Sequence, residues 1–234
     1  MSLADFYSSH WVVTFLVFFP AVAGIACLFI PKGWLKGFAF GAGMVEFLVS
    51  LPMFWTFQVG RIETQNFVSI PWIPDWGISY SLGVDGISIL LILLTTFLLP
   101  ISVLVSWEQI NTKERAYYSM LLVLVTGILG VFVALDLFLF YVFWEITLIP
   151  MYFLIGVWGH ERRIYAAVKF FLFTAFGSLL MLVAILVLFW LHLDQFGFAS
   201  MAYHEMLRLN IGGAMEYWLF AIISLIRQLP RYRR

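Results

Sequence analysis

Residues 117–158 read YYSMLLVLVTGILGVFVALDLFLFYVFWEITLIPMYFLIGVW. A helix that crosses about 30 Å of hydrocarbon needs about 20 mostly apolar residues, and this stretch is about twice that long. Asp136 is the only charged residue that precedes Glu145 in it. We therefore expect two consecutive membrane-spanning helices, at about 118–135 and 137–158, with Asp136 at their junction and almost no loop between them.

Further apolar segments of spanning length flank this stretch, at about residues 11–30, 34–57, 86–106 and 164–192. A seventh begins near Tyr217 and is still apolar at Ile226, after which we expect a basic, aberrant tail at 227–234. The predicted fold class is an all-α integral membrane protein, a polytopic helix bundle that forms a single domain over residues 1–234. It has six complete transmembrane helices and a truncated seventh.

Composition supports a membrane protein and excludes several functions. The chain is 63% hydrophobic and 11% charged, whereas soluble domains are about half apolar and about a quarter charged. Its formal net charge is zero, which gives no electrostatic footprint for nucleic acid. The single cysteine, Cys27, lies in an apolar run. We therefore expect no disulfide and no cysteine-based zinc or iron–sulfur site, so that any redox centre lies on a partner.

Positive charge alternates between connections, which predicts the orientation. Ten of the 13 basic residues fall in the first, third and fifth connections and the tail: Lys32, Lys36, Lys113, Arg115, Arg162, Arg163, Arg227, Arg231, Arg233 and Arg234. Because cytoplasmic loops retain Lys and Arg, the N-terminus is predicted outside and the tail inside.

The long 58–85 connection differs from the other connections in its amino-acid composition. It mixes turn-forming prolines with the aromatic residues that favour membrane interfaces: Pro71, Trp72, Pro74, Trp76 and Tyr80. We expect an outer interfacial loop, in the form of a short hairpin.

Ionisable residues inside spans are costly and therefore mark candidate functional sites. Glu145 stands nine residues from Asp136 and thirteen from Trp158, which at about 1.5 Å per residue places it near mid-membrane. Tyr141 and Tyr152 add hydroxyl groups at compatible helical spacing. A carboxyl group in such a place can serve a proton relay. The structural reading is a protonated glutamate that only hydrogen-bonds a neighbouring helix.

Two further charges lie within spans. Lys169 lies about five residues inside the cytoplasmic end of its span, roughly 10 Å nearer the cytoplasm than Glu145. Coupling between the two would need water, and snorkelling of the lysine to the interface is an equal alternative. Glu46, midway along the second span, fits a neutral, hydrogen-bonded structural role better than catalysis.

Asp85 and Asp136 are expected to cap helices, because each precedes an apolar run at a helix N-terminus. The histidines lie at or outside span ends without the close spacing of a metal site, so we predict no metal or cofactor site: His10, His160, His192 and His204.

Three runs carry a resemblance to a known family. Residues 136–159 (DLFLFYVFWEITLIPMYFLIGVWG) resemble the fifth helix of the proton-pumping M subunits, or chain 4, of bacterial NADH–quinone oxidoreductase, the respiratory complex I. These subunits are related to multi-subunit cation/proton antiporters. Residues 80–88 (YSLGVDGIS) and 166–171 (AAVKFF) are similar to the same family.

The resemblance implies a membrane-arm subunit of the prokaryotic plasma (inner) membrane that couples quinone reduction to proton translocation. It implies that Glu145 is the mid-membrane glutamate of that machinery and that Lys169 is a basic residue near it. NADH, FMN, iron–sulfur clusters and quinone would be bound by partner subunits of the complex, and no cofactor by this chain.

The chain also departs from the family pattern. Family members are longer and carry a lysine in the seventh helix, where this sequence has Arg227, and the lysine's role is not carried over to that arginine. A subunit of a cation/proton antiporter or of a related membrane hydrogenase complex is one alternative. The other is a truncated bundle that inserts into the membrane but pumps nothing.

Overall fold

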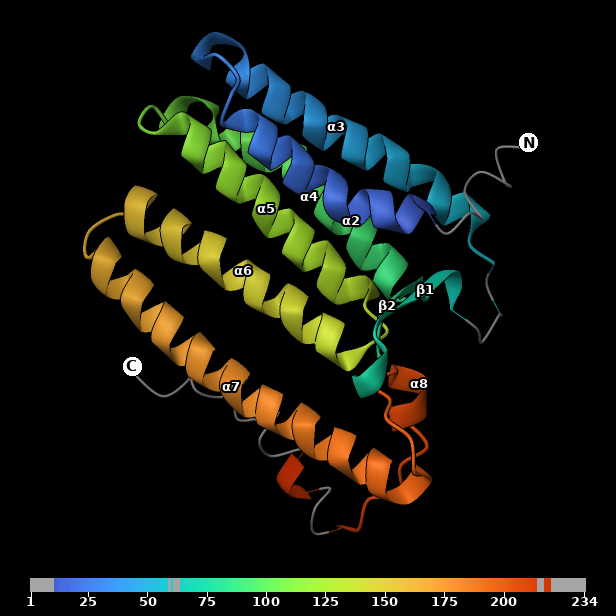
Figure 1. Cartoon of the computed structure of the whole chain (residues 1–234). Coiled ribbons are helices and arrows are strands. Elements are labelled where there is room, and N and C mark those ends of the chain that lie inside the picture. The colour runs from blue at the N-terminus through green and yellow to red at the C-terminus, as the bar shows by residue number, and fades with distance from the viewer. Residues whose placement is uncertain (1–10, 59, 61–63, 214–216, 220–234) are drawn as a thin grey trace.

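In the computed structural model, six long helices make up most of the described part of the chain (Figure 1). The structure describes residues 11–58, 60, 64–213 and 217–219. The helices are α2 (Trp11–Cys27), α3 (Lys32–Thr56), α4 (Ser88–Gln109), α5 (Glu114–Val133), α6 (Leu137–Trp158) and α7 (Arg163–Phe196). In the described chain, α3 to α7 are long and apolar enough to cross a membrane, and α2 is a shorter apolar helix of 17 residues.

These helices confirm the six predicted segments, including the division of the central stretch at Asp136. The predicted seventh span lies outside the described residues, apart from residues 217–219, and the 227–234 tail lies wholly outside them.

The α2–α3, α4–α5 and α6–α7 connections gather at one end of the bundle, which we call the basic end (Figure 1). Two of its basic side chains donate hydrogen bonds to other segments of the chain there. The Lys36 ammonium group donates to the carbonyl of Trp107 at 2.6 Å, and the Arg115 guanidinium donates to the carbonyl of Ile30 at 3.0 Å. The alternation of basic loops in the sequence therefore corresponds to one end of the folded bundle.

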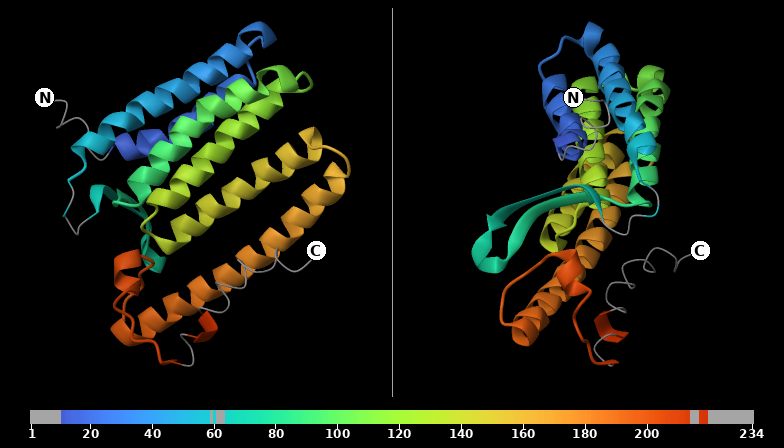
Figure 2. Two further views of the ribbon diagram at one scale, coloured as in Figure 1. Left: turned by 180° about the vertical axis from the view of Figure 1, so that it is seen from behind. Right: turned by 90° about the vertical axis from the view of Figure 1, so that its right-hand side faces the viewer.

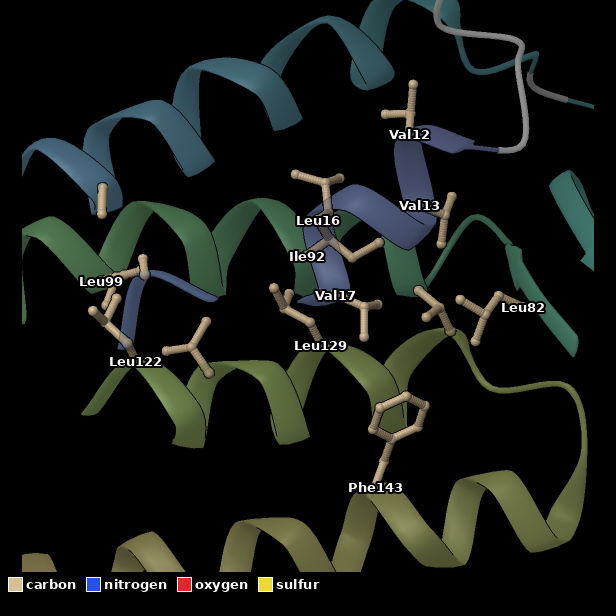
Figure 3. Close-up of a cluster of buried hydrophobic side chains, with 14 of the residues drawn as sticks. Val12, Val13, Leu16, Val17, Leu82, Ile92, Leu99, Leu122, Leu129 and Phe143 are labelled. Atoms are coloured by element: carbon tan, nitrogen blue, oxygen red, sulfur yellow. The ribbon is translucent and has the colours of Figure 1, made fainter. Parts of the chain in front are cut away.

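Helix α5 is the centre of the packing. It contacts α2, α3, α4 and α6, and apolar side chains from these helices meet around it (Figure 3). Two glycines let α6 approach closely. A Cβ on Gly127 would lie 2.6 Å from Cγ2 of Thr147, and one on Gly130 would overlap the ring of Phe143. Small residues at a helix crossing allow this close backbone approach in membranes.

Helix α7 lies at the edge of the bundle and packs mainly against α6 (Figures 1 and 2). Many of its large apolar side chains are exposed, among them Phe173, Phe176, Leu179, Val183 and Trp190.

The other end of the bundle, the hairpin end, carries a two-stranded antiparallel sheet of β1 (Gln65–Ile73) and β2 (Ile78–Val84). The strands are joined by the short 3-10 helix η1 (Pro74–Trp76). This confirms the hairpin predicted within 58–85, while the placement of that loop at the outer membrane surface stays a prediction. The sheet extends sideways from the helices (Figure 2).

The hairpin is joined to the segment between α7 and the short helix α8 (Tyr203–Met206). Gly77 adopts φ +59°, and a Cβ there would overlap the carbonyl of Ala199. The carbonyl of Gly77 accepts the N–H of Met201 at 3.1 Å. Only glycine combines the left-handed backbone with this close approach.

Candidate functional site

Helix α6, which carries the principal candidate residue, begins at a buried aspartate. Asp136 Oδ1 accepts the backbone N–H groups of Phe138 and Leu139 at 3.0 and 3.1 Å. Its Oδ2 accepts the N–H of Ser79 in β2 at 3.0 Å. The predicted cap is confirmed, and it also fixes the start of α6 to the hairpin.

The environment of Asp136 changes its acidity. Burial raises the pKa of this carboxyl group above that of an ordinary aspartate, and the hydrogen bonds from Ser79, Leu139 and Phe138 oppose the rise. The side chain is 1% exposed. Its four hydrogen bonds, with Ser79, Phe138 and Leu139, fix the position of the first turn of α6.

Glu145 lies near the middle of α6 and is half-buried. It is thirteen residues from Trp158 at the basic end, or about 20 Å along the helix axis. Its Oε1 atom is buried and has no hydrogen-bond partner among the residues that the structure describes. A buried oxygen without a partner is costly, so the packing of the described helices does not satisfy this carboxyl group.

The hydroxyl group of Tyr141 lies beside Glu145, and that of Ser178 lies beside Tyr141. The Tyr141 hydroxyl, one turn earlier on α6, interacts with the carboxyl group of Glu145 and with the side chain of Ser178 on α7. Ser178 is buried, and its hydroxyl donates to the carbonyl of Ala175 at 2.9 Å. We call Tyr141, Glu145 and Ser178 the Glu145 cluster. The oxygen-bearing side chains of this cluster connect α6 to α7. Ser178 was not predicted from the sequence.

Lys169 lies apart from this cluster. Its side chain is exposed on α7, with Nζ 5.7 Å from the ring centroid of Tyr165 and 6.0 Å from that of Phe173. Within the described part of the chain, no ion pair joins it to Glu145. It is six residues from the start of α7, so it sits about 10 Å nearer the basic end than Glu145.

Tyr152, the second predicted hydroxyl of α6, does not join the cluster. Its ring packs edge-on against Phe171 with the centroids 5.5 Å apart. The two residues line a cavity of about 260 Å³ between α6 and α7, together with Val168 and Leu172. The predicted stripe of hydroxyl groups is therefore divided between two environments.

Glu46 is fully buried in α3. Both of its carboxyl oxygens lack a hydrogen-bond partner among the described residues, whereas the sequence favoured a hydrogen-bonded role. One turn later, the Ser50 hydroxyl lies 2.8 Å from that of Thr96 on α4, which satisfies those two groups without Glu46.

Asp85 caps α4, as predicted. Its Oδ1 accepts the N–H groups of Ile87 and Ser88 at 3.0 and 2.7 Å, and its own N–H donates to the Ser88 hydroxyl at 2.8 Å. Burial alone would raise the pKa of Asp85, but the hydrogen bonds from Ser88 and Ile87 outweigh it and hold the pKa below its ordinary value.

Asp85 and Asp136 both line a cavity of about 300 Å³ at the hairpin end. Its wall also includes Thr64, Ser88, Phe140 and Tyr203. Both carboxylates accept hydrogen bonds from backbone N–H groups. The acidic side chains of this cavity therefore serve as helix caps.

A cluster of ionisable side chains at the end of α7 was not predicted from the sequence. His192 is fully buried; its Nδ1 lies 3.1 Å from the carbonyl oxygen of Phe198, and its Nε2 lies 3.8 Å from Oε2 of Glu205. Arg208 donates to the same carboxylate at 2.9 Å. No set of three or more His, Cys, Asp or Glu side chains is arranged for a metal ion in residues 11–58, 60, 64–213 and 217–219.

Two family models match the chain. The model described as "NADH-ubiquinone oxidoreductase chain 4, amino terminus" matches residues 16–135. The model described as "NADH:quinone oxidoreductase/Mrp antiporter, TM" matches residues 134–229. The boundary between them falls at the α5–α6 junction.

Curated relatives agree with these models. The NADH-quinone oxidoreductase subunit M of Escherichia coli strain K12 is 41% identical over 169 residues, which is 70% of this chain and 33% of that protein. The F(420)H(2) dehydrogenase subunit M of Methanosarcina mazei is 34% identical over 197 residues, which is 84% of this chain and 40% of that protein. The chain thus spans two fifths or less of the length of these relatives.

Solved structures show the same fold. A chain of respiratory complex I from Thermus thermophilus with bound NADH superimposes with a TM-score of 0.78 at 26% identity, over 93% of this chain and 43% of that one. A chain of the Mrp complex from Dietzia gives 0.71 at 17% identity over 92% of this chain and 22% of its own, which shows the fold alone. The six helices, the two matching family models and the subunit M relatives together make the chain a multi-pass membrane protein of the NADH–ubiquinone oxidoreductase chain 4 family.

Proposed function

We propose that the chain belongs to the membrane arm of a proton-translocating NADH–quinone oxidoreductase and that Glu145 carries translocated protons. The observation that supports this most directly is the Glu145 carboxyl group at mid-span. It has a buried oxygen without a hydrogen-bond partner in the described chain and a hydroxyl neighbour that reaches the next helix. Ionisable groups at such depth characteristically mark proton pathways.

The Glu145 cluster has the chemistry of a short relay. A hydroxyl group both donates and accepts, so the Tyr141 and Ser178 hydroxyls can pass a proton by receiving one and releasing another. Charge changes that accompany quinone reduction elsewhere in the complex alter the electrostatic cost of a charged Glu145. The carboxyl group then takes up or releases a proton, because in a medium of low dielectric constant even a distant charge acts strongly.

Lys169 is proposed as the second residue of proton translocation. Its ammonium group is about 10 Å from the level of Glu145, so it acts through water and through its field, without a direct ion pair. The aromatic rings of Tyr165 and Phe173 hold the cation near this level of α7.

The redox chemistry is proposed to lie on partner subunits, which would hold NADH, FMN, the iron–sulfur clusters and quinone. The names of relatives support this, because one is a subunit of an NADH-quinone oxidoreductase and another of an F(420)H(2) dehydrogenase. A chain that serves different electron donors does not itself need to bind them. The proposed location is the prokaryotic plasma membrane, in contact with other membrane-arm subunits.

A cation/proton antiporter subunit is the second candidate, and the common fold with a chain of the Mrp complex favours it. The two candidates differ in their driving force. An antiporter exchanges cations for protons in sealed vesicles without quinone reduction, whereas the proposed subunit moves protons only during electron transfer.

The test is Glu145→Gln in the native complex, assayed in inverted membrane vesicles. We expect NADH-driven acidification to be lost while the complex still assembles, because Gln keeps the shape but cannot exchange a proton. Glu161→Gln, in the exposed α6–α7 connection, is the matched control and should pump normally. Unchanged pumping by Glu145→Gln would remove the proposal.

A further inference from the structure

Helix α7 carries, near its end, a buried histidine that the proposed function does not use. His192 has no accessible surface, and its ring contacts those of Phe196 and Phe198, with the centroids 4.8 and 4.9 Å away. Its Nε2 atom is buried and has no hydrogen-bond partner among the described residues. A buried polar atom without a partner is costly, so the packing around His192 leaves one of its nitrogens unsatisfied.

The contacts of the ring indicate which nitrogen carries the hydrogen. Nδ1 of His192 lies 3.1 Å from the carbonyl oxygen of Phe198, and a carbonyl oxygen can only accept. In the neutral ring the hydrogen is therefore on Nδ1, and Nε2 has a lone pair. Nε2 lies 3.8 Å from Oε2 of Glu205, which is also an acceptor when the carboxyl group is ionised. Since two acceptors cannot bond, the neutral ring leaves this contact open.

Glu205 is held in its place beside the ring. Arg208 donates to its Oε2 at 2.9 Å, and the guanidinium group of Arg208 lies 5.6 Å from the ring centroid of Phe196. Within the described chain, Glu205 has the only carboxylate within ion-pair distance of His192. The other ionisable residues of α8, the end of α7, η1 and the start of α6 are Tyr203, His204, Asp194, Asp75 and Asp136.

Three of these ionisable side chains form a series from water to the buried ring. The exposed fraction of the side chain is 70% for His204, 18% for Glu205 and 0% for His192. Nε2 of His204 lies 3.6 Å from Oε1 of Glu205, and Nε2 of His192 lies 3.8 Å from the other oxygen of the same carboxyl group. Each gap is longer than a hydrogen bond by about 1 Å or less, so a small side-chain movement closes it. A proton from water therefore has a route to His192.

Glu205 lies on a segment that is bonded to the start of α6. The N–H of Tyr203, on the same short helix α8, donates to the carbonyl of Leu135 at 2.8 Å. The N–H of Leu137, the first residue of α6, donates to the carbonyl of Met201 at 2.9 Å. A bond between the Glu205 carboxylate and α7 therefore joins α6 and α7 at the hairpin end.

We propose that His192 is a proton-binding site at the hairpin end and that its protonation closes a contact with Glu205, which we call the His192 latch. The proton comes from water through His204 and Glu205 and binds to the lone pair of Nε2. The new Nε2–H donates a charge-assisted hydrogen bond to Oε2 of Glu205, which shortens their contact to about 2.7–2.9 Å. The carboxylate offsets the desolvation of the buried imidazolium. Histidine suits this role because its charge ordinarily changes around neutral pH.

The latch also regulates pumping, and this part of the proposal rests on the proposed function. The hairpin end is predicted to face outside, where pumped protons are released. As protons accumulate there, the latch closes and stiffens the α6–α7 pair, across which Tyr141 meets Ser178. Pumping then slows, so the released proton limits its own delivery.

The first test observes the latch directly and is independent of the proposed function. The protein has four histidines, so the triple variant His10→Gln/His160→Gln/His204→Gln leaves His192 as the source of every imidazole signal. Nitrogen-15 NMR spectra of this chain in lipid should show the Nδ1–H form of the neutral ring at alkaline pH. They should show the imidazolium at acid pH.

Two substitutions in that background test the contact with Glu205. At a pH where the His192 ring is half-protonated, Glu205→Gln should lower the ratio of charged to neutral ring by about tenfold or more, because it removes the neighbouring negative charge. Asp194→Asn removes an equal charge from an exposed position of α7 and should leave the ratio nearly unchanged. Equal ratios in the two variants overturn the latch. A neutral ring with its hydrogen on Nε2 overturns it as well, even if Glu205→Gln does not fold.

The second test concerns regulation and uses the native complex in inverted vesicles, whose lumen corresponds to the outside. As the lumen is buffered to lower pH, pumping by the parent and by Asp194→Asn should slow severalfold over the range in which His192 titrates. Glu205→Gln should slow less, while the opposing proton gradient acts on all three alike. Equal slowing of all three overturns the regulatory role. Normal pumping by Glu145→Gln overturns the proposed function instead, and the NMR spectra still decide whether the latch exists.

Discussion

Asp136 and Ser79 are 57 residues apart in the sequence, yet the Asp136 carboxylate accepts the backbone N–H of Ser79 at 3.0 Å. The same side chain caps α6, so one carboxylate holds both the hairpin and the helix that carries Glu145. The position of the Glu145 cluster therefore depends on a residue about 13 Å away along the helix.

Asp136→Ala should destabilise the protein by about 2–4 kcal/mol, because it removes a helix cap and leaves the buried N–H of Ser79 without a partner. Denaturant unfolding in detergent micelles measures this loss. Asp136→Asn keeps an oxygen for the cap and should lose less. Equal stability of the Ala variant and the parent would contradict the anchoring role.

Acid should weaken the α4 cap in a defined window. The pKa of Asp85 is lower in the folded state than in the unfolded chain. The stabilisation that the charged Asp85 gives the fold is therefore complete above the ordinary aspartate pKa of about 3.9. It is lost as the pH falls through the lower pKa of the folded state. Asp85→Asn should flatten the fall in unfolding free energy in this acid range. A slope identical to that of the parent protein would show that the Asp85 cap does not contribute.

Tyr141→Phe should slow proton pumping without loss of assembly, because it deletes the hydroxyl between Glu145 and Ser178 but keeps the ring. Tyr152→Phe is a matched control on the same helix, since that ring packs against Phe171. Vesicle acidification and subunit content are the measurements. Equal pumping by the two variants would exclude a relay role for Tyr141.

Gly130→Ala should destabilise the bundle by about 1–3 kcal/mol, because its Cβ would overlap the Phe143 ring and force α5 and α6 apart. Gly41→Ala in α3 meets open space and should be neutral or slightly stabilising. Adding Phe143→Leu to Gly130→Ala should restore part of the lost stability. A double variant that is less stable than Gly130→Ala would argue against this steric account.

Lys169→Met should reduce pumping, whereas Lys169→Arg should preserve much of it, because the proposed action requires only the positive charge. If the lysine simply snorkels to the interface, both variants should pump normally and differ only in expression. Pumping rates normalised to the assembled complex separate these outcomes.

Much of the fold follows from local sequence. Segment length and hydropathy predict each long helix, and a single charge, Asp136, divides the central stretch correctly because a carboxylate is favoured at a helix N-terminus. Asp85 is predictable for the same reason. The hairpin also follows, from prolines and interfacial aromatics.

What the sequence did not reveal depends on contacts between distant segments. Ser178 reaches the Tyr141 hydroxyl only because α6 and α7 pack in one register, and His192 is buried only because residues after α7 fold back over it. The absence of partners for Glu46 is likewise a property of the packed bundle. Periodicity within a helix indicates which side chains share a face, but not what lies opposite that face.

The interlocked backbone at the hairpin end fixes an order of events during synthesis. The carbonyl of Gly77 bonds to Met201, and that of Leu135 bonds to the N–H of Tyr203 at 2.8 Å. The ribosome makes the hairpin and α6 long before residue 201, so these bonds form only after α7 has been inserted. The hairpin therefore stays incompletely bonded until α7 has been made, and its last backbone hydrogen bonds form only when the segment after α7 returns to it.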